Sequence, residues 1–398
     1  MNKKISLGLA ISLICVFVAV AITITMTVAM NIYNKIIKDV SERSNLYSSI
    51  SEIDDIVRKN YFGKINENLL ASMMSSGYID GLGDRYSYYM TATEYAEYKE
   101  KEKGNDGGIG VIAVYDSKNN NIYVSEVSED SPAQLQGISK GDVITAVDSV
   151  GVTPNNYQDL INRLSGDKLT TVDVTFTHEG ENKTVSVARG YEAQTVFYSI
   201  NNNVGYIKIL AFYSNTADQL KTAIKYMESN GVKSVIFDVR NNNSGLIEYA
   251  VDCIDLIVPV AIEGNGAIAT TVDKDGNTLE TFTSDSSSVN FAMIILVNGN
   301  TAGASELFAC DLRDFGLAKL VGTKTTGNGT MQKIFELSDG SAIALTVAKI
   351  IPYKSECYDK IGLTPDYVVE LTYEQNSRLE MLIFEEDAQY QKAYEILG

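Results

Sequence analysis

The chain opens with a long apolar segment that fits a membrane-spanning helix. Residues Ile5 to Met30 carry no charged side chain, and a helix of that length crosses a bilayer. Two lysines precede this segment and two follow it closely, so the charge bias that orients such a helix is weak. A cleaved signal peptide is the alternative, but its apolar region is normally shorter and ends at a small-x-small site, which TVAM matches poorly. We expect residues 1–34 to hold a cytoplasmic tip and an uncleaved anchor, with the bulk of the chain outside the cytoplasm at the cell membrane.

Hydrophobic periodicity divides the rest of the chain into four segments. In residues 35–103 apolar side chains recur every three or four positions, which predicts a helical region. Residues 104–190 hold short alternating runs such as NIYVSEV between Gly, Asn and Asp turns, which predicts a β-rich domain. In residues 191–375 strand-like runs such as SVIFDVR alternate with amphipathic helical stretches, which predicts an α/β domain with a largely parallel sheet. Residues 376–398 are expected to form a helical tail. The fold class is therefore α/β and multidomain.

Charge narrows the range of partners. The 398 residues include 51 acidic and 33 basic side chains, a formal charge of −18. Such a chain repels phosphate backbones, so nucleic acid is not expected as a partner.

Cysteine and histidine are too sparse for several common kinds of site. The four cysteines are scattered and form no CxxC or Cys/His cluster, so we expect free thiols and no metal or other cofactor. The single histidine, His178, lies in a turn between two strand-like runs. It serves as the base of a catalytic triad only if the tip of that hairpin reaches the nucleophile.

A glycine-rich turn opens the β-rich domain. Glycines let successive backbone N–H groups point at one anion such as a peptide's terminal carboxylate, and the adjacent strand edge can accept the peptide. An ordinary turn is the alternative. The later runs SPAQLQG and ISKGDVITAVDSVGV resemble the pattern of PDZ domains, in which a Ser-Pro-Ala turn precedes a helix and Gly-Asp leads into a strand. The predicted peptide-binding residues are Gly107, Gly108, Ile109, Gly110 and Val111.

A serine lies where a strand-like run gives way to a helix. Ser305 belongs to TAGASELFACDLRDFG, which directly follows AMIILVNGN. At such a junction the helix N-terminus offers backbone N–H groups and a positive dipole end for an oxyanion. The alternative is a first-turn residue with a local hydrogen bond.

The ordered set of motifs resembles the C-terminal processing peptidases, also called tail-specific proteases. The similarity runs from Tyr61 to Asp366 and includes GDRYSYYMTATEY, GGIGV, FDVRNNNSGL, the serine motif, VGTKTTGNGTMQ and IGLTPD. The resemblance implies a helical region, a PDZ domain that captures polypeptide C-termini, and an α/β serine-peptidase core.

The same resemblance assigns site residues. The nucleophile falls on Ser305, the oxyanion donors on the backbone N–H groups of Glu306 and Gly245, and the orienting glutamine on Gln332. The family's lysine base corresponds to Asn328, and its Asn-Pro-Gly-Gly loop reads Asn-Asn-Ser-Gly in residues 242–245.

The asparagine separates the functional hypotheses. A desolvated lysine can lose its proton and act as a base, whereas asparagine cannot. Lys324 would share a face with Asn328 on an extended strand, and Lys333 is expected to point away. We expect a membrane-anchored, extracytoplasmic serine endopeptidase of the C-terminal processing type. The alternatives are a catalytically impaired pseudopeptidase that binds polypeptide C-termini as an adaptor or regulator, and a purely structural membrane protein. The sequence is compatible with an oligomer of this chain.

Overall fold

The computed structural model describes residues 7–103, 107–166, 168–259, 267–284 and 288–398. Its contacts divide the chain into two compact units, residues 1–74 and 75–398.

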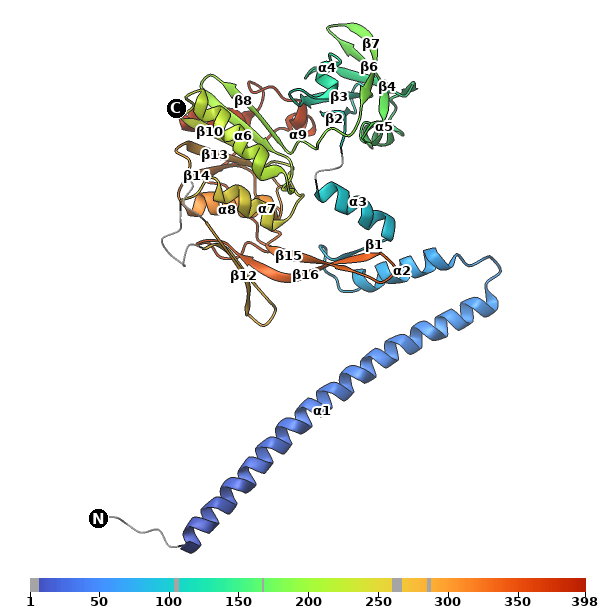
Figure 1. Cartoon of the computed structure of the whole chain (residues 1–398), viewed down its shortest axis with the longest axis vertical. Helices are drawn as coiled ribbons and strands as arrows, with labels where there is room; N and C mark the ends of the chain where they lie inside the picture. Colours follow the sequence, from blue (N-terminus) through green and yellow to red (C-terminus); the bar gives the residue numbers. More distant parts are fainter. Residues whose placement is uncertain (1–6, 104–106, 167, 260–266, 285–287) are drawn as a thin grey trace, which may run out of the picture. The chain divides into compact units, whose positions relative to one another are not determined.

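The first unit is dominated by one helix, α1 (Leu7–Asn60), which is drawn in blue in Figure 1. Within it, Val16–Asn34 is long and apolar enough to cross a membrane, a criterion that a signal sequence also meets. The predicted start of the apolar segment, Ile5, lies outside the described residues. Arg58, in the last turn of α1, pairs with Glu67 at the start of α2 (Glu67–Asp80).

The β-rich domain has the predicted character. Its sheet runs in the order β2-β3-β4-β6-β7, with β5 paired to β4, and all pairs are antiparallel. Buried Ile122, Ile144 and Phe176 lie in its core. The elements are β2 (Val111–Asp116), β3 (Asn121–Val127), α4 (Pro132–Leu135), β4 (Val143–Val147), β5 (Val150–Gly151), α5 (Tyr157–Arg163), β6 (Thr171–His178) and β7 (Glu181–Ala188).

The α/β core contains the largely parallel sheet that the alternation of strands and helices predicted. Its order is β17-β14-β13-β10-β9-β8, and only the edge strand β8 runs antiparallel to its neighbour. The strands are β8 (Val196–Asn201), β9 (Val204–Ile209), β10 (Ser234–Asp238), β13 (Ala292–Val297), β14 (Ala318–Gly322) and β17 (Tyr367–Val368). The helices are α6 (Thr216–Ser229), α7 (Ile247–Asp255), α8 (Ala304–Asp314), α9 (Tyr373–Ser377) and α10 (Ala388–Leu397), with the 3-10 turn η2 (Leu379–Met381).

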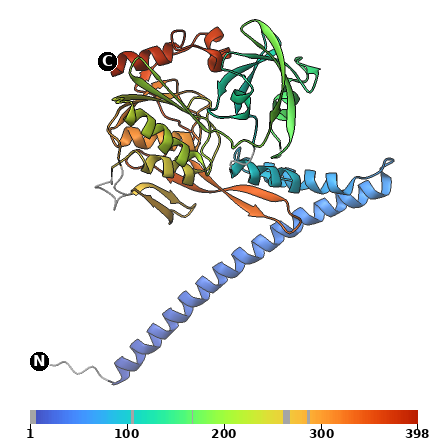
Figure 2. The same ribbon diagram turned by 45° about the horizontal axis from the view of Figure 1, so that its top comes forward.

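The parallel strands are apolar on both faces because helices cover both. Val235 and Phe237 of β10 belong to the cluster that includes α6, α7 and α8, whereas Ile236 between them packs with Tyr390 of α10. Figure 2 shows α6, α7 and α8 grouped on one side of this sheet and the C-terminal helix on the other. The alternation follows from the two-residue period of a strand.

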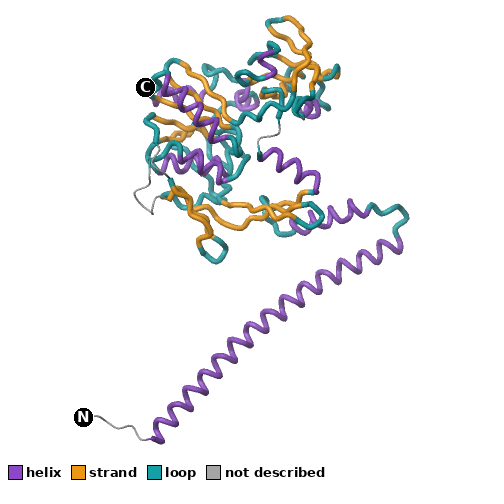
Figure 3. The backbone as a smooth tube through the Cα atoms, in the orientation of Figure 1, coloured by secondary structure: helices purple, strands orange, loops and turns teal. Residues whose placement is uncertain are grey.

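A further sheet was not anticipated from the sequence. Strands β1, β16, β11 and β12 form it in that order, and β15 pairs with β16 (Figure 3). Its antiparallel strands pair segments that lie far apart in sequence, as Tyr88 does with Ala344, and periodicity does not report such pairing. The bounds are β1 (Tyr88–Met90), α3 (Ala92–Glu102), β11 (Ala267–Val272), β12 (Thr278–Thr283), β15 (Thr330–Glu336) and β16 (Ala342–Ile351).

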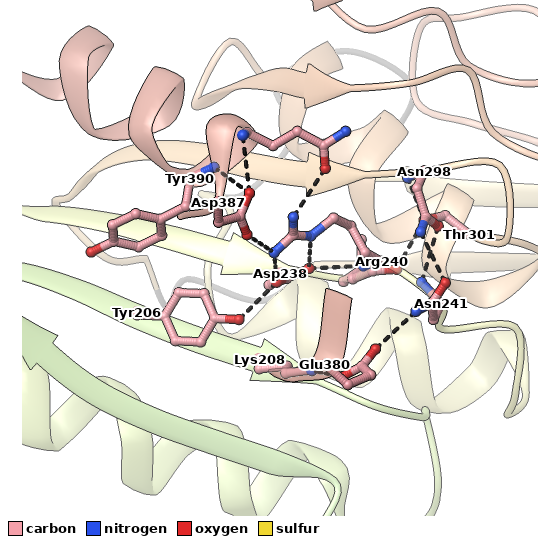
Figure 4. A network of polar contacts seen from close by, with 12 residues as sticks. Tyr206, Lys208, Asp238, Arg240, Asn241, Asn298, Thr301, Glu380, Asp387 and Tyr390 are labelled. Atoms are coloured by element: carbon pink, nitrogen blue, oxygen red, sulfur yellow. Dashed lines mark hydrogen bonds and ion pairs between the residues drawn. The ribbon is translucent and has the colours of Figure 1, made fainter. Parts of the chain in front are cut away.

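A buried polar network joins the C-terminal segment to the parallel sheet (Figure 4). The Arg240 guanidinium lies 2.6 Å from Asp238 and 2.7 Å from Asp387, and all three side chains are at least 94% buried. Asp387 also accepts hydrogen bonds from the first backbone N–H groups of α10, which caps that helix. Beside this network, Glu380 of η2 accepts a hydrogen bond from Asn241 at 2.8 Å. The C-terminal segment is therefore a structural part of the core.

Candidate active site

The candidate site lies where β10 and β13 end. These strands are parallel neighbours, so their carboxyl ends meet at one edge of the sheet, the usual place for ligands in α/β proteins. The loop after β10 and the loop before α8 are joined there, because the Ala302 N–H donates to the Asn242 carbonyl at 3.0 Å. A pocket of about 390 Å³ opens beside them. Among its lining residues are Asn243, Ser244, Gly245, Ala302, Gly303, Ala304, Asn328, Thr330 and Gln332.

Gly303 forms a sharp turn between the loop and α8. Its backbone angles are φ 62° and ψ −116°, a conformation that only glycine adopts without strain. A Cβ atom added to Gly303 would lie 3.4 Å from the Asn328 Nδ2 atom, and both residues line the pocket. Tyr358 steadies the turn by donating a hydrogen bond to the Gly303 carbonyl at 3.3 Å. The side-chain position that faces Asn328 across the pocket therefore belongs to a glycine.

Ser305 does not face the pocket. Its exposed fraction is 0%, it is not among the lining residues, and its hydroxyl has no hydrogen-bond partner among the described residues. The expectation that this hydroxyl faces the groove is wrong for this structure. The reason is helical geometry, because two residues turn a helix by about 200° and carry Ser305 to the side opposite Gly303.

Two backbone N–H groups at the pocket, those of Ala304 and Gly245, are available to bind an oxyanion. The N–H of Glu306, the predicted donor, is bonded to the Gly303 carbonyl at 3.0 Å in this structure. The N–H of Ala304, at the first helical position, and that of Gly245 bond to no described residue, and both residues line the pocket. Gly245 thus lies where the sequence predicted it. Residue 245 has to be glycine because its φ is 111° and because a Cβ atom would lie only 2.1 Å from the Phe212 carbonyl oxygen.

The Glu306 side chain connects α8 to the loop that carries Asn328. Its carboxylate accepts hydrogen bonds from Gly303 N–H at 3.1 Å, Gly327 N–H at 2.8 Å and Asn328 N–H at 2.7 Å, and from the Thr325 hydroxyl. Burial raises the pKa of the Glu306 carboxyl, and these hydrogen bonds oppose the rise. Glu306 thereby sets the distance between Gly303 and Asn328. The sequence suggested only its backbone role.

Asn328 and Gln332 are brought together, but only through Thr330. The Asn328 Oδ1 atom accepts from the Thr330 hydroxyl at 2.8 Å, and Gln332 Nε2 donates to that hydroxyl, also at 2.8 Å. Gln332 further donates to Thr346 at 3.2 Å, while its Oε1 atom has no partner among the described residues. Asn328 and Gln332 therefore lie close together, as predicted. The side chain of residue 328 is an amide, whereas serine-type catalysis needs a base.

Neither of the two lysines considered as a substitute base, Lys324 or Lys333, lines the pocket. Lys324 and Lys333 are both exposed and absent from its lining, and the Lys333 ammonium lies over the Phe335 ring. His178 lies in the β-rich domain, where its Nδ1 atom is 2.8 Å from Asp142. Within the described part of the chain, no three His, Cys, Asp or Glu side chains gather in a way that could hold a metal ion.

The glycine-rich turn of the β-rich domain has unused donors. The N–H groups of Ile109 and Gly110 bond to no described residue, while their carbonyls accept from Ala133 and Ser128. Strand β2, which follows the turn, is an edge strand of its sheet. The arrangement can accept a carboxylate at the turn and an extended peptide along β2.

Comparison with known sequences agrees with this geometry. Residues 107–188 match the model of the PDZ domain, and residues 203–369 match the model of peptidase family S41. The chain carries a domain of peptidase family S41 at residues 203–369. It is similar to a CtpA-like serine protease of Staphylococcus epidermidis, with 32% identity over 327 residues, or 82% of this chain and 65% of the relative. A CtpA-like serine protease of Staphylococcus aureus is 29% identical over 333 residues, 83% of this chain and 66% of the relative.

This chain spans about 65% of the length of the first of these relatives. Its fold is similar to that of an S41 protease from Bacteroides fragilis, with a TM-score of 0.57 and 18% identity over 85% of this chain and 90% of that one. The relatives are serine proteases by name, so the family chemistry is hydrolysis of peptide bonds. In the pocket of this chain, Asn328 lies opposite Gly303.

Proposed function

We propose that this chain is a membrane-anchored, extracytoplasmic S41-family protein that binds polypeptides without hydrolysing them through a serine and a lysine. The PDZ domain takes the C-terminus, and the pocket beside α8 takes an extended segment. One observation carries the proposal: the Cβ position 3.4 Å from Asn328 Nδ2 belongs to Gly303, so residue 303 offers no nucleophilic hydroxyl and residue 328 offers no titratable base. A nucleophile and a base within hydrogen-bond reach are the minimum for serine-type catalysis.

A serine endopeptidase that cleaves near polypeptide C-termini is the second candidate. The Ser305 hydroxyl has no hydrogen-bond partner among the described residues, so no such bond holds it in the interior. The first turn of α8 would have to unwind to bring it to the pocket, and a base would still have to be supplied. The relatives named above favour this candidate, whereas the pocket favours the first.

Degradation of an unstructured protein with an apolar C-terminus separates the two candidates. Wild type and Ser305→Ala are both expected to leave this protein intact at the level of a no-enzyme control, because Ser305 is buried. Cleavage products are measured by mass spectrometry, with the full chain in detergent micelles. Cleavage by wild type that disappears in Ser305→Ala would overturn the first proposal and establish the second.

The PDZ part of the proposal predicts a dependence on the free carboxylate. Amidation of a peptide's C-terminus is expected to weaken binding about tenfold or more, because charge-assisted hydrogen bonds to Ile109 and Gly110 are lost. Gly110→Ala is expected to abolish this difference, since its Cβ would lie 2.2 Å from the Ser131 Cβ. Fluorescence anisotropy with matched peptides measures both effects.

Gly137→Ala is the matched control for this experiment. Gly137 has a similar positive φ, 83° against 88°, but nothing lies within 4 Å of its Cβ position. The control is expected to retain the preference for the free carboxylate. Equal binding of the free and amidated peptides by wild type would contradict carboxylate capture by this turn.

The anchor is proposed from the apolar stretch Val16–Asn34 in α1. We expect the full chain to stay in the membrane fraction after carbonate extraction, and a protease added outside the cell to reach the PDZ domain. Release of an N-terminally shortened chain into the medium would instead indicate a cleaved signal sequence.

A further inference from the structure

Part of the pocket lining is acidic and aromatic. Glu102 ends α3 and Glu248 lies in the first turn of α7, and both carboxylates line the pocket. Among the rings of the lining are those of Tyr88, Tyr98 and Tyr213. Glu102 and Glu248 are used neither by the turn at Gly303 nor by the loop that carries Asn328, so the features described above leave their presence unexplained.

The two carboxylates line one pocket, and neither has a cationic partner among the described residues. Burial raises the pKa of both, and Glu248 raises that of Glu102 further by repulsion. Glu280 and Asp252, the other charged groups that influence Glu248, are also acidic. Among the described residues, neither carboxylate forms an ion pair. Arg85 also lines the pocket, but it is exposed, and its guanidinium lies 4.9 Å from the centre of the Tyr86 ring.

A cationic side chain would relieve this arrangement. Partly buried carboxylates gain most from a positive charge that enters the same low-dielectric space, and tyrosine faces attract ammonium and guanidinium groups. An apolar side chain would fit the rings but would leave the two carboxylates uncompensated.

We propose that Glu102 and Glu248 make the S41 pocket selective for a lysine or arginine side chain of the bound polypeptide. This inference rests on the proposed binding function and names the polypeptides that bind. Glu248 contacts the incoming cation close to the loop of Gly245, and Glu102 contacts it from α3. Selectivity therefore arises at the pocket, separately from capture of the C-terminus by the PDZ domain.

The test measures binding of short fluorescent peptides to the full chain in detergent micelles. All peptides are amidated at the C-terminus, so that the PDZ turn contributes little, and they differ only in one central residue, Lys, Arg, Met or Glu. Wild type is expected to bind the Lys and Arg peptides about tenfold more tightly than the Met peptide, and the Glu peptide least. Glu248→Gln and Glu102→Gln are each expected to remove most of that preference and to leave the Met peptide unchanged.

Control variants on the same helices distinguish a local effect from net charge. Asp252→Asn on α7 and Glu97→Gln on α3 remove one charge each outside the pocket lining and are expected to keep the preference. Equal binding of the Lys and Met peptides by wild type would overturn the proposed selectivity but not the proposed binding function. An equal loss of the Lys preference in the control variants would do the same. Failure of every peptide to bind would overturn the proposed binding function, and the selectivity with it.

Discussion

Gly303→Ser combined with Asn328→Lys is expected to create proteolytic activity at least about 100-fold above that of wild type. The serine hydroxyl would project from the position that faces residue 328, 3.4 Å from Nδ2 of the present asparagine. The lysine would lie beside Gln332, whose Oε1 atom is unpaired among the described residues and can accept from the ammonium. The N–H groups of Ala304 and Gly245 would bind the oxyanion. Turnover of the unstructured protein substrate is the measurement.

The single variants are the controls for this experiment. Gly303→Ser alone lacks a base and Asn328→Lys alone lacks a nucleophile, so each is expected to stay near background. The serine at a φ of 62° costs of order 1 kcal/mol in strain, which lowers stability without preventing folding. Activity in Asn328→Lys alone that depends on Ser305 would contradict the assignment of Gly303 as the position of the nucleophile.

Arg240→Ala is expected to lower the free energy of unfolding by about 3–5 kcal/mol, the largest stability effect we predict. Loss of the guanidinium would leave Asp238 and Asp387 buried without a counter-ion and would release the cap of α10 from the sheet. The chain has no tryptophan and 24 tyrosines, so urea unfolding is followed by tyrosine fluorescence or circular dichroism.

Arg163→Ala is the matched control, because Arg163 pairs with Asp159 on the surface of the PDZ domain. It is expected to change stability by about 0.5 kcal/mol or less. A similar loss in both variants would contradict a special role for the buried network.

The effect of Arg240→Ala is expected to depend on pH. Burial alone would raise the pKa of Asp238, but Arg240 and the other partners of its carboxylate more than offset this and hold the pKa below its usual value. The stabilisation by Asp238 is therefore present above about pH 4 and is lost as the pH falls through the folded-state pKa. The difference between wild type and Arg240→Ala should narrow in acid. A constant difference across this range would exclude Asp238 as its source.

Hydrophobic periodicity predicted much of the fold. The run NIYVSEV is strand β3, SVIFDVR contains β10, and TADQLKTAIKYMESNG contains α6. Local pattern was sufficient there because each element buries one face, or both, against a neighbour. The sheet of β1, β11, β12, β15 and β16 was missed because its pairing joins distant segments, as in Tyr88 with Ala344.

The candidate site was predicted in part. Gly245, Asn328 and Gln332 line the pocket as expected, because motifs identify loops and loops carry sites. Ser305 was chosen because serine is the residue type that can act as a nucleophile, whereas a glycine at the same turn carries no chemical signal. Gly303 itself was the signal that could have located the turn. A positive φ at a strand-to-helix junction favours glycine.

Order and spacing of residues along the chain were enough to predict a PDZ domain and a parallel α/β core, and the family resemblance predicted that Asn328 stands at the position of a lysine. They could not establish which side chain opposes Asn328, because that depends on the direction in which each residue leaves a helix and on how two loops meet. Folding brings Gly303 to the pocket and turns Ser305 into the core. The difference is a rotation of about 200° over two residues, and it decides which of the two residues lines the pocket.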